Sequence, residues 1–131
     1  MRYMLDTNTV SNLLKGHPNV AQRIVAVPIT SLCISAITEG ELLFGLAKRP
    51  SAERLHIAVG EFLRRADVLP WDSAVAKHCG TVRANLESRG KILSPLDLLI
   101  AAHALAVGAV LVTNDRAFGL VANLESQDWM E

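Results

Sequence analysis

The chain contains few aromatic residues and few cysteines. Aromatic side chains make up 5% of the 131 residues, whereas 50% are hydrophobic, so the core must be built mainly from aliphatic side chains. Its two cysteines, Cys33 and Cys79, lie in apolar segments, which argues against a disulfide framework and indicates core thiols in a reducing compartment. A chain of this length is expected to form one domain, residues 1–131, that buries roughly two thirds of its unfolded surface.

The sequence also lacks an excess of charge and a long apolar run. Thirteen basic and thirteen acidic residues balance, which argues against a uniformly nucleic-acid-coating surface but permits a local basic patch. The longest apolar run, Leu98–Val112, is too short to span a bilayer and contains His103 and Gly108. Asp6 interrupts the apolar segment that a signal peptide would need. We therefore expect a soluble cytoplasmic protein with no membrane partner.

Short apolar segments alternate with helical patterns along the chain. Strands are expected at residues 3–5, 32–34, 68–69 and 109–113, with a weak last strand near Leu124. Helices are expected at residues 9–15, 37–48, 73–89 and 94–107, with shorter ones after Pro18 and Pro50 and a turn at residues 116–120. Apolar strands that alternate with helices predict an α/β fold, in which a parallel sheet of about five strands is sandwiched between helices.

Four acidic residues occupy comparable positions at the ends of these elements. Asp6 follows the first strand, Asp115 follows the last strong one, Glu41 lies in the helix after the second, and Asp97 lies in the first turn of an apolar helix. The carboxyl ends of parallel strands meet at one sheet edge, where ligands bind in open α/β folds. Four carboxylates there would repel one another without a cation. Oxygen ligands without histidine or cysteine favour Mg²⁺, or Mn²⁺ as a substitute, over zinc.

Helix capping is the alternative role for these acids. The segments Thr38-x-x-Glu41 and Ser94-x-x-Asp97 match the capping box, and the other two acids stand at N-cap positions. Capping does not require the acids to converge, whereas a metal site does. The four histidines are scattered over separate elements, and His103, six residues beyond Asp97, is expected to be structural.

Taken together, the polar motifs resemble the PIN-domain family, and within it the VapC-type toxins of bacterial toxin–antitoxin pairs. The resemblance spans the whole chain, including its closing Asp128-Trp129. It is carried by Asp6-Thr7-Asn8, by Ser35 with Glu41-Leu42, by Asp97 opening an Ala-rich helix, and by Val112-Thr113-Asn114-Asp115 with Phe118.

This resemblance implies a metal-dependent endoribonuclease in which the four acids are the catalytic, metal-binding residues. Asp6 and Asp97 would be direct Mg²⁺ ligands, and Glu41 and Asp115 would hold water, a second metal or the attacking water. Metal-activated water would cleave a structured RNA, such as a tRNA or rRNA loop, and leave a 5′-phosphate and a 3′-hydroxyl. The polar residues that would orient the acids are Thr7, Asn8 and Thr113.

The resemblance leaves several residue assignments to be tested. Glu39 is a rival to Glu41, but it lies about 200° around the helix, so both cannot face one site. Basic residues must flank an acidic site for RNA to approach, and Arg116 and Lys91 are the expected contacts.

The family resemblance also implies protein partners. These are a cognate VapB-like antitoxin that inhibits the enzyme, a second copy of the chain in a homodimer, and a higher toxin–antitoxin assembly. An apolar segment of such a partner could lie on a groove floored by hydrophobic residues that could equally be core. These are Leu43, Phe44, Leu46, Leu55 and Phe62.

Two other functions fit parts of the sequence. A haloacid-dehalogenase-like phosphotransferase also begins with a strand that ends in Asp and uses Mg²⁺, but it needs a second Asp where Asn8 stands. A non-catalytic α/β binding module would need only helix caps. Magnesium dependence of the melting temperature tests this second alternative, because a convergent acid cluster gains stability on binding metal and isolated caps do not.

Overall fold

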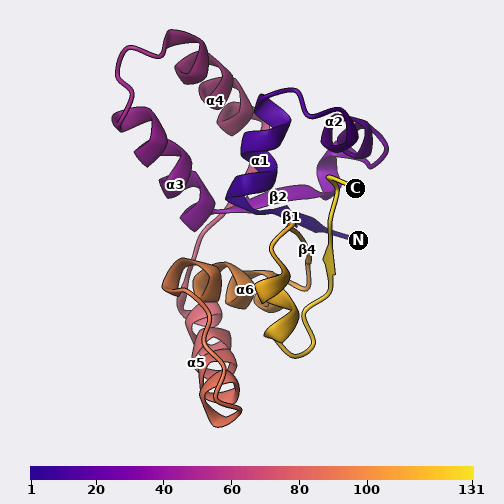
Figure 1. Ribbon diagram of the computed structural model, residues 1–131, viewed down its shortest axis with the longest axis vertical. Coiled ribbons are helices and arrows are strands. Elements are labelled where there is room, and N and C mark those ends of the chain that lie inside the picture. Colours follow the sequence, from indigo (N-terminus) through magenta and orange to yellow (C-terminus); the bar gives the residue numbers. More distant parts are fainter.

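A five-stranded parallel sheet forms the centre of the protein, for which a computed structural model describes all residues from 1 to 131 (Figure 1). The strand order is β3-β2-β1-β4-β5, and every pairing is parallel, which confirms the predicted sheet. The final strand lies slightly later than predicted, because Leu124 belongs to the turn that precedes it. The strands are β1 Tyr3–Leu5, β2 Leu32–Ser35, β3 Asp67–Leu69, β4 Val110–Val112 and β5 Ser126–Gln127.

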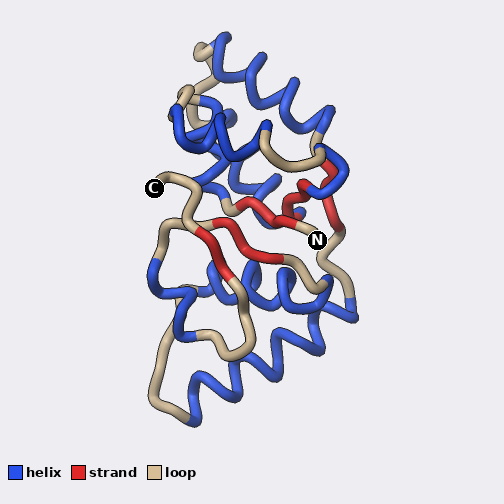
Figure 2. The backbone as a smooth tube through the Cα atoms, turned by 90° about the vertical axis from the view of Figure 1, so that its right-hand side faces the viewer, coloured by secondary structure: helices blue, strands red, loops and turns tan.

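Helices cover both faces of this sheet. Four helices, α1 to α4, lie on one side, and α5 and α6 lie on the other with the short 3₁₀ segment η2 (Figures 1 and 2). The helix α6 ends at Gly108, whose φ of +67° is a conformation that favours glycine. The helices are α1 Thr7–Leu14, α2 Pro18–Val25, α3 Ala36–Ala47, α4 Glu53–Arg65, α5 Ser73–Ser88 and α6 Pro95–Val107, and the 3₁₀ segments are η1 Ile29–Ser31 and η2 Arg116–Leu120.

Alternation along the strands divides the core in two. Successive strand residues point to opposite faces, so each of the three central strands contributes to both layers. One set, Met4, Cys33 and Leu111, packs with α5 and α6, and the other, Leu5, Ile34 and Val112, packs with α1, α3 and α4. Burial is the main cause that raises the pKa of the Cys33 thiol to about 11, which suits a core residue rather than a reactive one.

The order of the strands reverses beside β1. The chain runs outward from β1 to β2 and β3, and then returns through α5 and α6 to add β4 on the other side of β1. Open α/β sheets bind ligands at the carboxyl ends of the strands where the order reverses in this way. In this sheet that position lies between the ends of β1 and β4. None of the helices is long and apolar enough to cross a membrane.

Candidate active site

Asp6 is fixed at the carboxyl end of β1. Its amide donates to the Val112 carbonyl at 3.1 Å, which extends the pairing with β4, and its Oδ1 accepts the Thr9 amide at 2.8 Å as the N-cap of α1. The Thr9 hydroxyl also donates to Val112, at 3.0 Å. The side chain of Asp6 is only 6% exposed. The end of β1 and the start of α1 therefore hold this carboxylate in one orientation.

Glu41 is joined to α1 by a side-chain hydrogen bond. The Thr7 hydroxyl donates to Glu41 Oε1 at 2.5 Å, across 34 residues of sequence. Because Thr7 directly follows Asp6, this bond places Glu41 beside the end of β1, whereas Glu39 makes no side-chain hydrogen bond or ion pair. The capping-box interpretation of Thr38 and Glu41 is wrong, because Ser35 is the N-cap of α3 and accepts the Ile37 amide at 3.1 Å.

Asp97 lies in the first turn of α6 and experiences the charges of two other acids. Burial is the main cause that raises the pKa of its carboxyl, and the negative charges of Asp115 and Asp6 raise it further, while a hydrogen bond with Ser94 acts in the opposite direction. The Ser94 hydroxyl also accepts the Asp97 amide at 3.4 Å, which is half of the expected capping box. Three of the four acids therefore share one local electrostatic field.

Asp115 follows β4 and caps η2. Its Oδ1 accepts the Ala117 amide at 2.9 Å, and its own amide donates to Thr113 Oγ1 at 3.1 Å. Asn8 contacts no acid and instead donates to Asn114 Oδ1 at 2.8 Å, which ties the end of β1 to the end of β4. Asn114 is a residue whose contact the sequence did not indicate, because its partner lies 106 positions away.

Three of the acids have a carboxylate oxygen that makes no hydrogen bond within the chain. Asp6, Glu41 and Asp115 each use one carboxylate oxygen for a hydrogen bond within the chain, and the other oxygen makes none. Such donors suit a hard cation like Mg²⁺, and a cation would offset the repulsion that raises the pKa of Asp97. No group of three or more His, Cys, Asp and Glu side chains is arranged as a ready-made metal site. The metal ligands therefore stay a prediction.

A buried polar pair connects the second strand to α6. The Nδ1 atom of His103 lies 2.7 Å from Ser35 Oγ, and His103 is completely buried. Its Nε2 atom and the Thr38 hydroxyl have no hydrogen-bond partner. Burial lowers the pKa of His103, an effect that Asp72 partly opposes. The pair joins α3 and α6, the helices that carry Glu41 and Asp97, and it agrees with the structural role expected for His103.

This lowered pKa predicts a loss of stability in mild acid. Below the ordinary histidine pKa of 6.5, the unfolded chain binds a proton that folded His103 resists, so the free energy of unfolding should fall as the pH drops. For one such group, the free energy of unfolding falls by up to about 1.4 kcal/mol for each pH unit. Urea unfolding at several pH values should show a shallower dependence for His103→Gln. Equal slopes for the two proteins would contradict the prediction.

The two basic residues expected to contact RNA lie in separate cavities. Arg116 is exposed at the start of η2 and lines a polar cavity together with Asp115, Asp128 and Glu131. Lys91 is exposed in the loop before α6. Neither forms an ion pair. Their roles in binding RNA stay predictions.

Comparison with known proteins gives a consistent family. Residues 3–124 match the PIN domain. The chain is 36% identical to the tRNA(fMet)-specific endonuclease VapC of Shigella flexneri, over 98% of each chain, and 34% identical to ribonuclease VapC2 of Haemophilus influenzae, over 99% of each.

Solved structures agree with the sequence relatives. The toxin–antitoxin complex VapBC from Salmonella typhimurium, crystallised with DNA, contains a chain that is 37% identical, with a TM-score of 0.91 and coverage of 98% of both chains. The corresponding values for VapBC2 from Rickettsia felis are 32% identity and a TM-score of 0.89, over 97% of this chain and 98% of that one. The fold, the order of the acidic motifs and the full-length similarity together place this chain in the PIN-domain family, among the VapC ribonucleases.

Proposed function

We propose that the protein is a Mg²⁺-dependent endoribonuclease and the toxin of a toxin–antitoxin pair. The observation that carries the proposal is the arrangement of acids at the adjacent carboxyl ends of β1 and β4. Asp6 and Asp115 follow these two adjacent strands, Asp97 begins the helix that leads into β4, and each of the first two acids has one anchored and one available oxygen. This arrangement supports a site for a cation and a phosphodiester.

The residues of the chain would divide the work as follows. Asp6 and Asp97 would hold the cation, and Glu41 and Asp115 would orient the attacking water, with one carboxylate accepting its proton. Thr7 keeps one oxygen of Glu41 fixed, which leaves the other to face the water. The chemistry that bound Mg²⁺ supplies is charge neutralisation on the phosphate and acidification of water. No serine, cysteine or histidine nucleophile is needed, and the products are a 5′-phosphate and a 3′-hydroxyl.

The substrate we propose is a tRNA. The relatives from Shigella flexneri and Salmonella typhimurium, each 36% identical over 98% of this chain, are tRNA(fMet)-specific endonucleases. The similarity extends over nearly the whole length of the chain, so an initiator tRNA is the first substrate to test and an rRNA loop the second.

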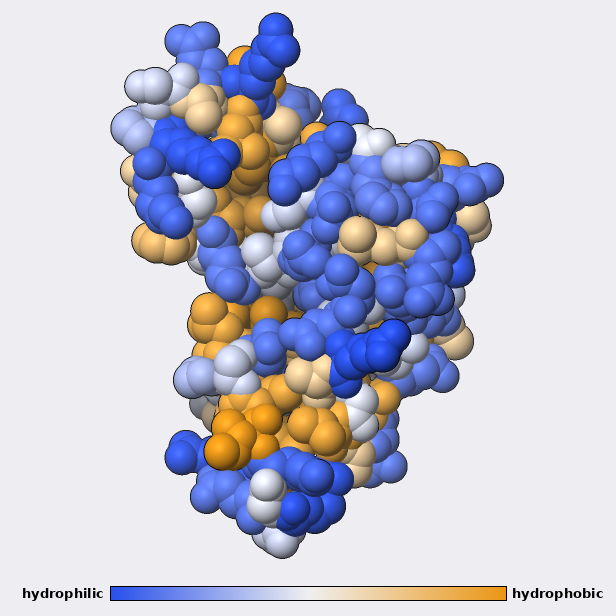
Figure 3. Space-filling view, in the orientation of Figure 1, coloured by the Kyte–Doolittle hydropathy of each residue, from blue (hydrophilic) through white to orange (hydrophobic).

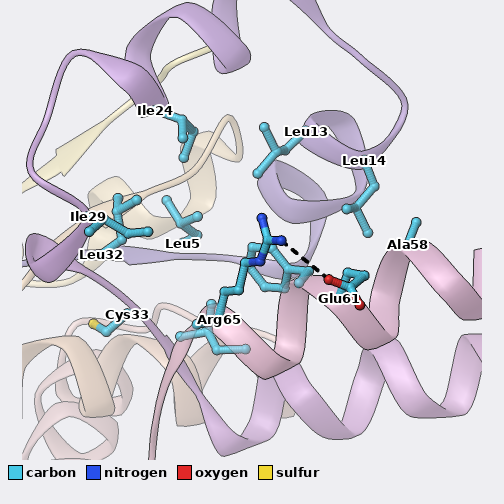
Figure 4. A pocket seen from close by; sticks show the side chains of 13 residues that line it. Leu5, Leu13, Leu14, Ile24, Ile29, Leu32, Cys33, Ala58, Glu61 and Arg65 are labelled. Atoms are coloured by element: carbon cyan, nitrogen blue, oxygen red, sulfur yellow. Dashed lines mark ion pairs between the residues drawn. The ribbon is translucent and has the colours of Figure 1, made fainter.

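We further propose a VapB-like antitoxin as partner, together with a homodimer of this chain in a larger assembly. Between α1, α2 and α4 lies a mainly apolar cavity of about 350 Å³, lined by residues that include Ile24, Ile29 and Phe62, with Glu61 and Arg65 paired in its lining (Figure 4). Such a cavity suits apolar side chains of a partner segment. Of the residues first expected to floor a groove, Leu43 and Phe44 are instead exposed on α3, where they are available to a partner.

The function is tested by incubating the purified, antitoxin-free protein with bulk tRNA and with rRNA, in Mg²⁺ or in EDTA. We expect discrete fragments with 5′-phosphate ends from tRNA in Mg²⁺ and intact RNA in EDTA. A folded protein that cleaves neither RNA would leave the non-catalytic binding module as the better explanation. Cleavage of rRNA alone would reject the tRNA proposal but keep the nuclease.

A change at Thr7 should weaken cleavage by way of Glu41. Thr7→Val preserves the shape of the side chain but removes the hydroxyl that fixes Glu41 Oε1. We expect cleavage to fall roughly 10- to 100-fold, the usual effect of losing a partner that orients a metal-site carboxylate. The measurement is the initial rate of tRNA cleavage in Mg²⁺.

Two comparisons separate this effect from a general loss of folding. Thr81→Val on α5 removes a hydroxyl that bonds only within its own helix, to Lys77, and should leave the rate unchanged. In a Glu41→Gln background, Thr7→Val should have little further effect, because the two residues act as one unit. Additive losses would contradict the coupling.

A further inference from the structure

A groove framed by α1, α3 and α4 leads away from the candidate acids. It encloses about 440 Å³, and Thr7 and Glu41 line it at the end nearest the site. Its floor is aliphatic and includes Leu46, Leu55 and Val59. Figure 3 shows an apolar strip in the hollow between α3 and α4, bordered by hydrophilic side chains. The groove is therefore continuous with the site but different from it in chemistry.

Three basic residues line the groove without acidic partners. Lys15 follows α1, Arg49 lies in the connection between α3 and α4, and Arg54 lies in the first turn of α4. All three are exposed, none belongs to any of the three ion pairs of the chain, and none donates a side-chain hydrogen bond within it. Glu41 is the only acid in the lining. Their charges are thus available to an anion.

The other cavities near the acids have less positive charge. The cavity that contains Arg116 also contains three acids, Asp115, Asp128 and Glu131, and would repel a phosphate. The cavity beside Lys91 holds one further cation, Arg83, which is paired with Glu87. In a chain with no net charge, the groove is the place beside the acids where unpaired cations gather.

We propose that this groove binds the backbone phosphates of the RNA strand on one side of the cleavage point. Lys15, Arg49 and Arg54 would contact successive phosphates, while a base or ribose lies against the aliphatic floor. The inference rests on the proposed nuclease function, and it names the binding surface for its substrate. Four acids repel RNA, so the affinity must come from cations close enough to hold the strand across them.

An RNA strand fits this groove better than an apolar protein segment does. A strand whose phosphate lies at Asp6 and Glu41 must leave the site over a neighbouring surface, and the groove shares Glu41 and Thr7 with that site. The mainly apolar cavity of Figure 4, by contrast, has only Glu61 and Arg65 as charged lining residues, and these two are paired. Charge complementarity therefore assigns the groove to phosphates.

The test uses the salt dependence of RNA binding. The triple variant Lys15→Gln, Arg49→Gln and Arg54→Gln is compared with a control that also loses three exposed cations, Arg23→Gln, Arg64→Gln and Lys77→Gln. Both are made in an Asp6→Asn background, which prevents cleavage during the titration. Binding of a short fluorescein-labelled oligouridylate is measured at a low, fixed Mg²⁺ concentration between about 50 and 200 mM NaCl.

The groove variant should lose most of its salt dependence. Removing three phosphate contacts from single-stranded RNA reduces the slope of log K against log salt by about 2. Between about 50 and 200 mM NaCl, the factor by which affinity falls should therefore be about twentyfold smaller for the groove variant than for the control. With an active Asp6, the groove variant should cleave tRNA with KM raised roughly tenfold and kcat nearly unchanged. Melting curves establish that both triple variants are folded.

The outcomes separate the groove from the nuclease function. If the groove variant and the control show equal slopes and the wild-type protein cleaves tRNA, the assignment of the groove to RNA phosphates is overturned. A protein partner is then the better occupant of the groove. A wild-type chain that neither binds nor cleaves RNA would overturn the proposed function, and the groove assignment with it. A lower slope in the groove variant alone supports the assignment.

Discussion

Replacement of Asp6 by asparagine should abolish RNA cleavage and leave the fold intact. Asparagine has the same shape, and its side-chain oxygen can still accept the Thr9 amide, so the cap of α1 is retained. The negative charge that would hold Mg²⁺ is lost. Loss of a residue that only orients a metal ligand costs up to about 100-fold, so loss of a direct ligand should exceed this. The measurement is the rate of tRNA cleavage at saturating Mg²⁺.

The matched variant Asp6→Ala separates the two roles of this side chain. It removes the charge and the cap together, so it should lose activity to the same extent and also about 0.5–2 kcal/mol of stability. Urea unfolding of both variants measures that difference. An Asp6→Asn protein that cleaves at a tenth of the wild-type rate or better would show that Asp6 is only a cap.

The sequence predicted the architecture well because local patterns encode it. The apolar segments at residues 32–34 and 109–113 became β2 and β4, and α5 and α6 between them begin at the expected residues, with Asp72 and Ser94 as their N-caps. The order of the strands was not encoded locally. The pairing of β1 with both β2 and β4 joins residues far apart in the chain, and only the packed sheet reveals it.

The candidate acids were predicted by their positions, and Thr7 and Thr113 were expected from the family resemblance to orient them, but which acid each of the two contacts was not predicted. The bond between Thr7 and Glu41 spans 34 residues, and that between Ser35 and His103 spans 68, so no spacing rule could indicate either. The cations of the groove were missed for a similar reason. Lys15, Arg49 and Arg54 stand at or near helix ends, where the sequence gives them the appearance of ordinary surface charges.

Helix capping by Asp6 and Asp115 is compatible with the metal binding that we propose for them. Asp6 and Asp115 do cap α1 and η2, as the simpler interpretation expected, but capping uses only one oxygen of each carboxylate. The hydrogen bond that caps the helix also fixes the direction of the second oxygen. A cap can therefore serve as the fixed support of a ligand, and evidence for one role is not evidence against the other.

Replacement of Asp97 by asparagine should have opposite effects on stability in EDTA and in Mg²⁺. The pKa of Asp97 is raised by burial and by the charges of Asp115 and Asp6, so the folded state holds a proton more tightly than the unfolded state. That stabilisation is present in acid and is lost as the pH rises through the raised pKa. At neutral pH the ionised carboxyl is therefore unfavourable, and its removal should raise Tm in EDTA.

The increase in EDTA should be small, because Asp97 is partly exposed and solvent screens its charge. We expect the free energy of unfolding in EDTA to rise by less than about 1 kcal/mol, and Tm to rise by up to roughly 4 °C. In Mg²⁺ the order should reverse. Mg²⁺ at 100 times its Kd should stabilise the wild type by about 2.7 kcal/mol, whereas the variant, which lacks the proposed metal-binding carboxylate, should gain little stability. Its rate of tRNA cleavage should fall by more than about 100-fold.

This reversal tests the origin of the acid cluster. If the four acids were only helix caps, Asp97→Asn would change Tm equally in EDTA and in Mg²⁺, because no cation would couple to the fold. If they converge on Mg²⁺, the same repulsion that destabilises the metal-free protein provides the attraction for the ion. Asp97, whose ionised carboxyl destabilises the metal-free protein, is then a residue on which metal binding depends. Melting curves of the wild type and of Asp97→Asn, each in EDTA and in Mg²⁺, decide between the two alternatives.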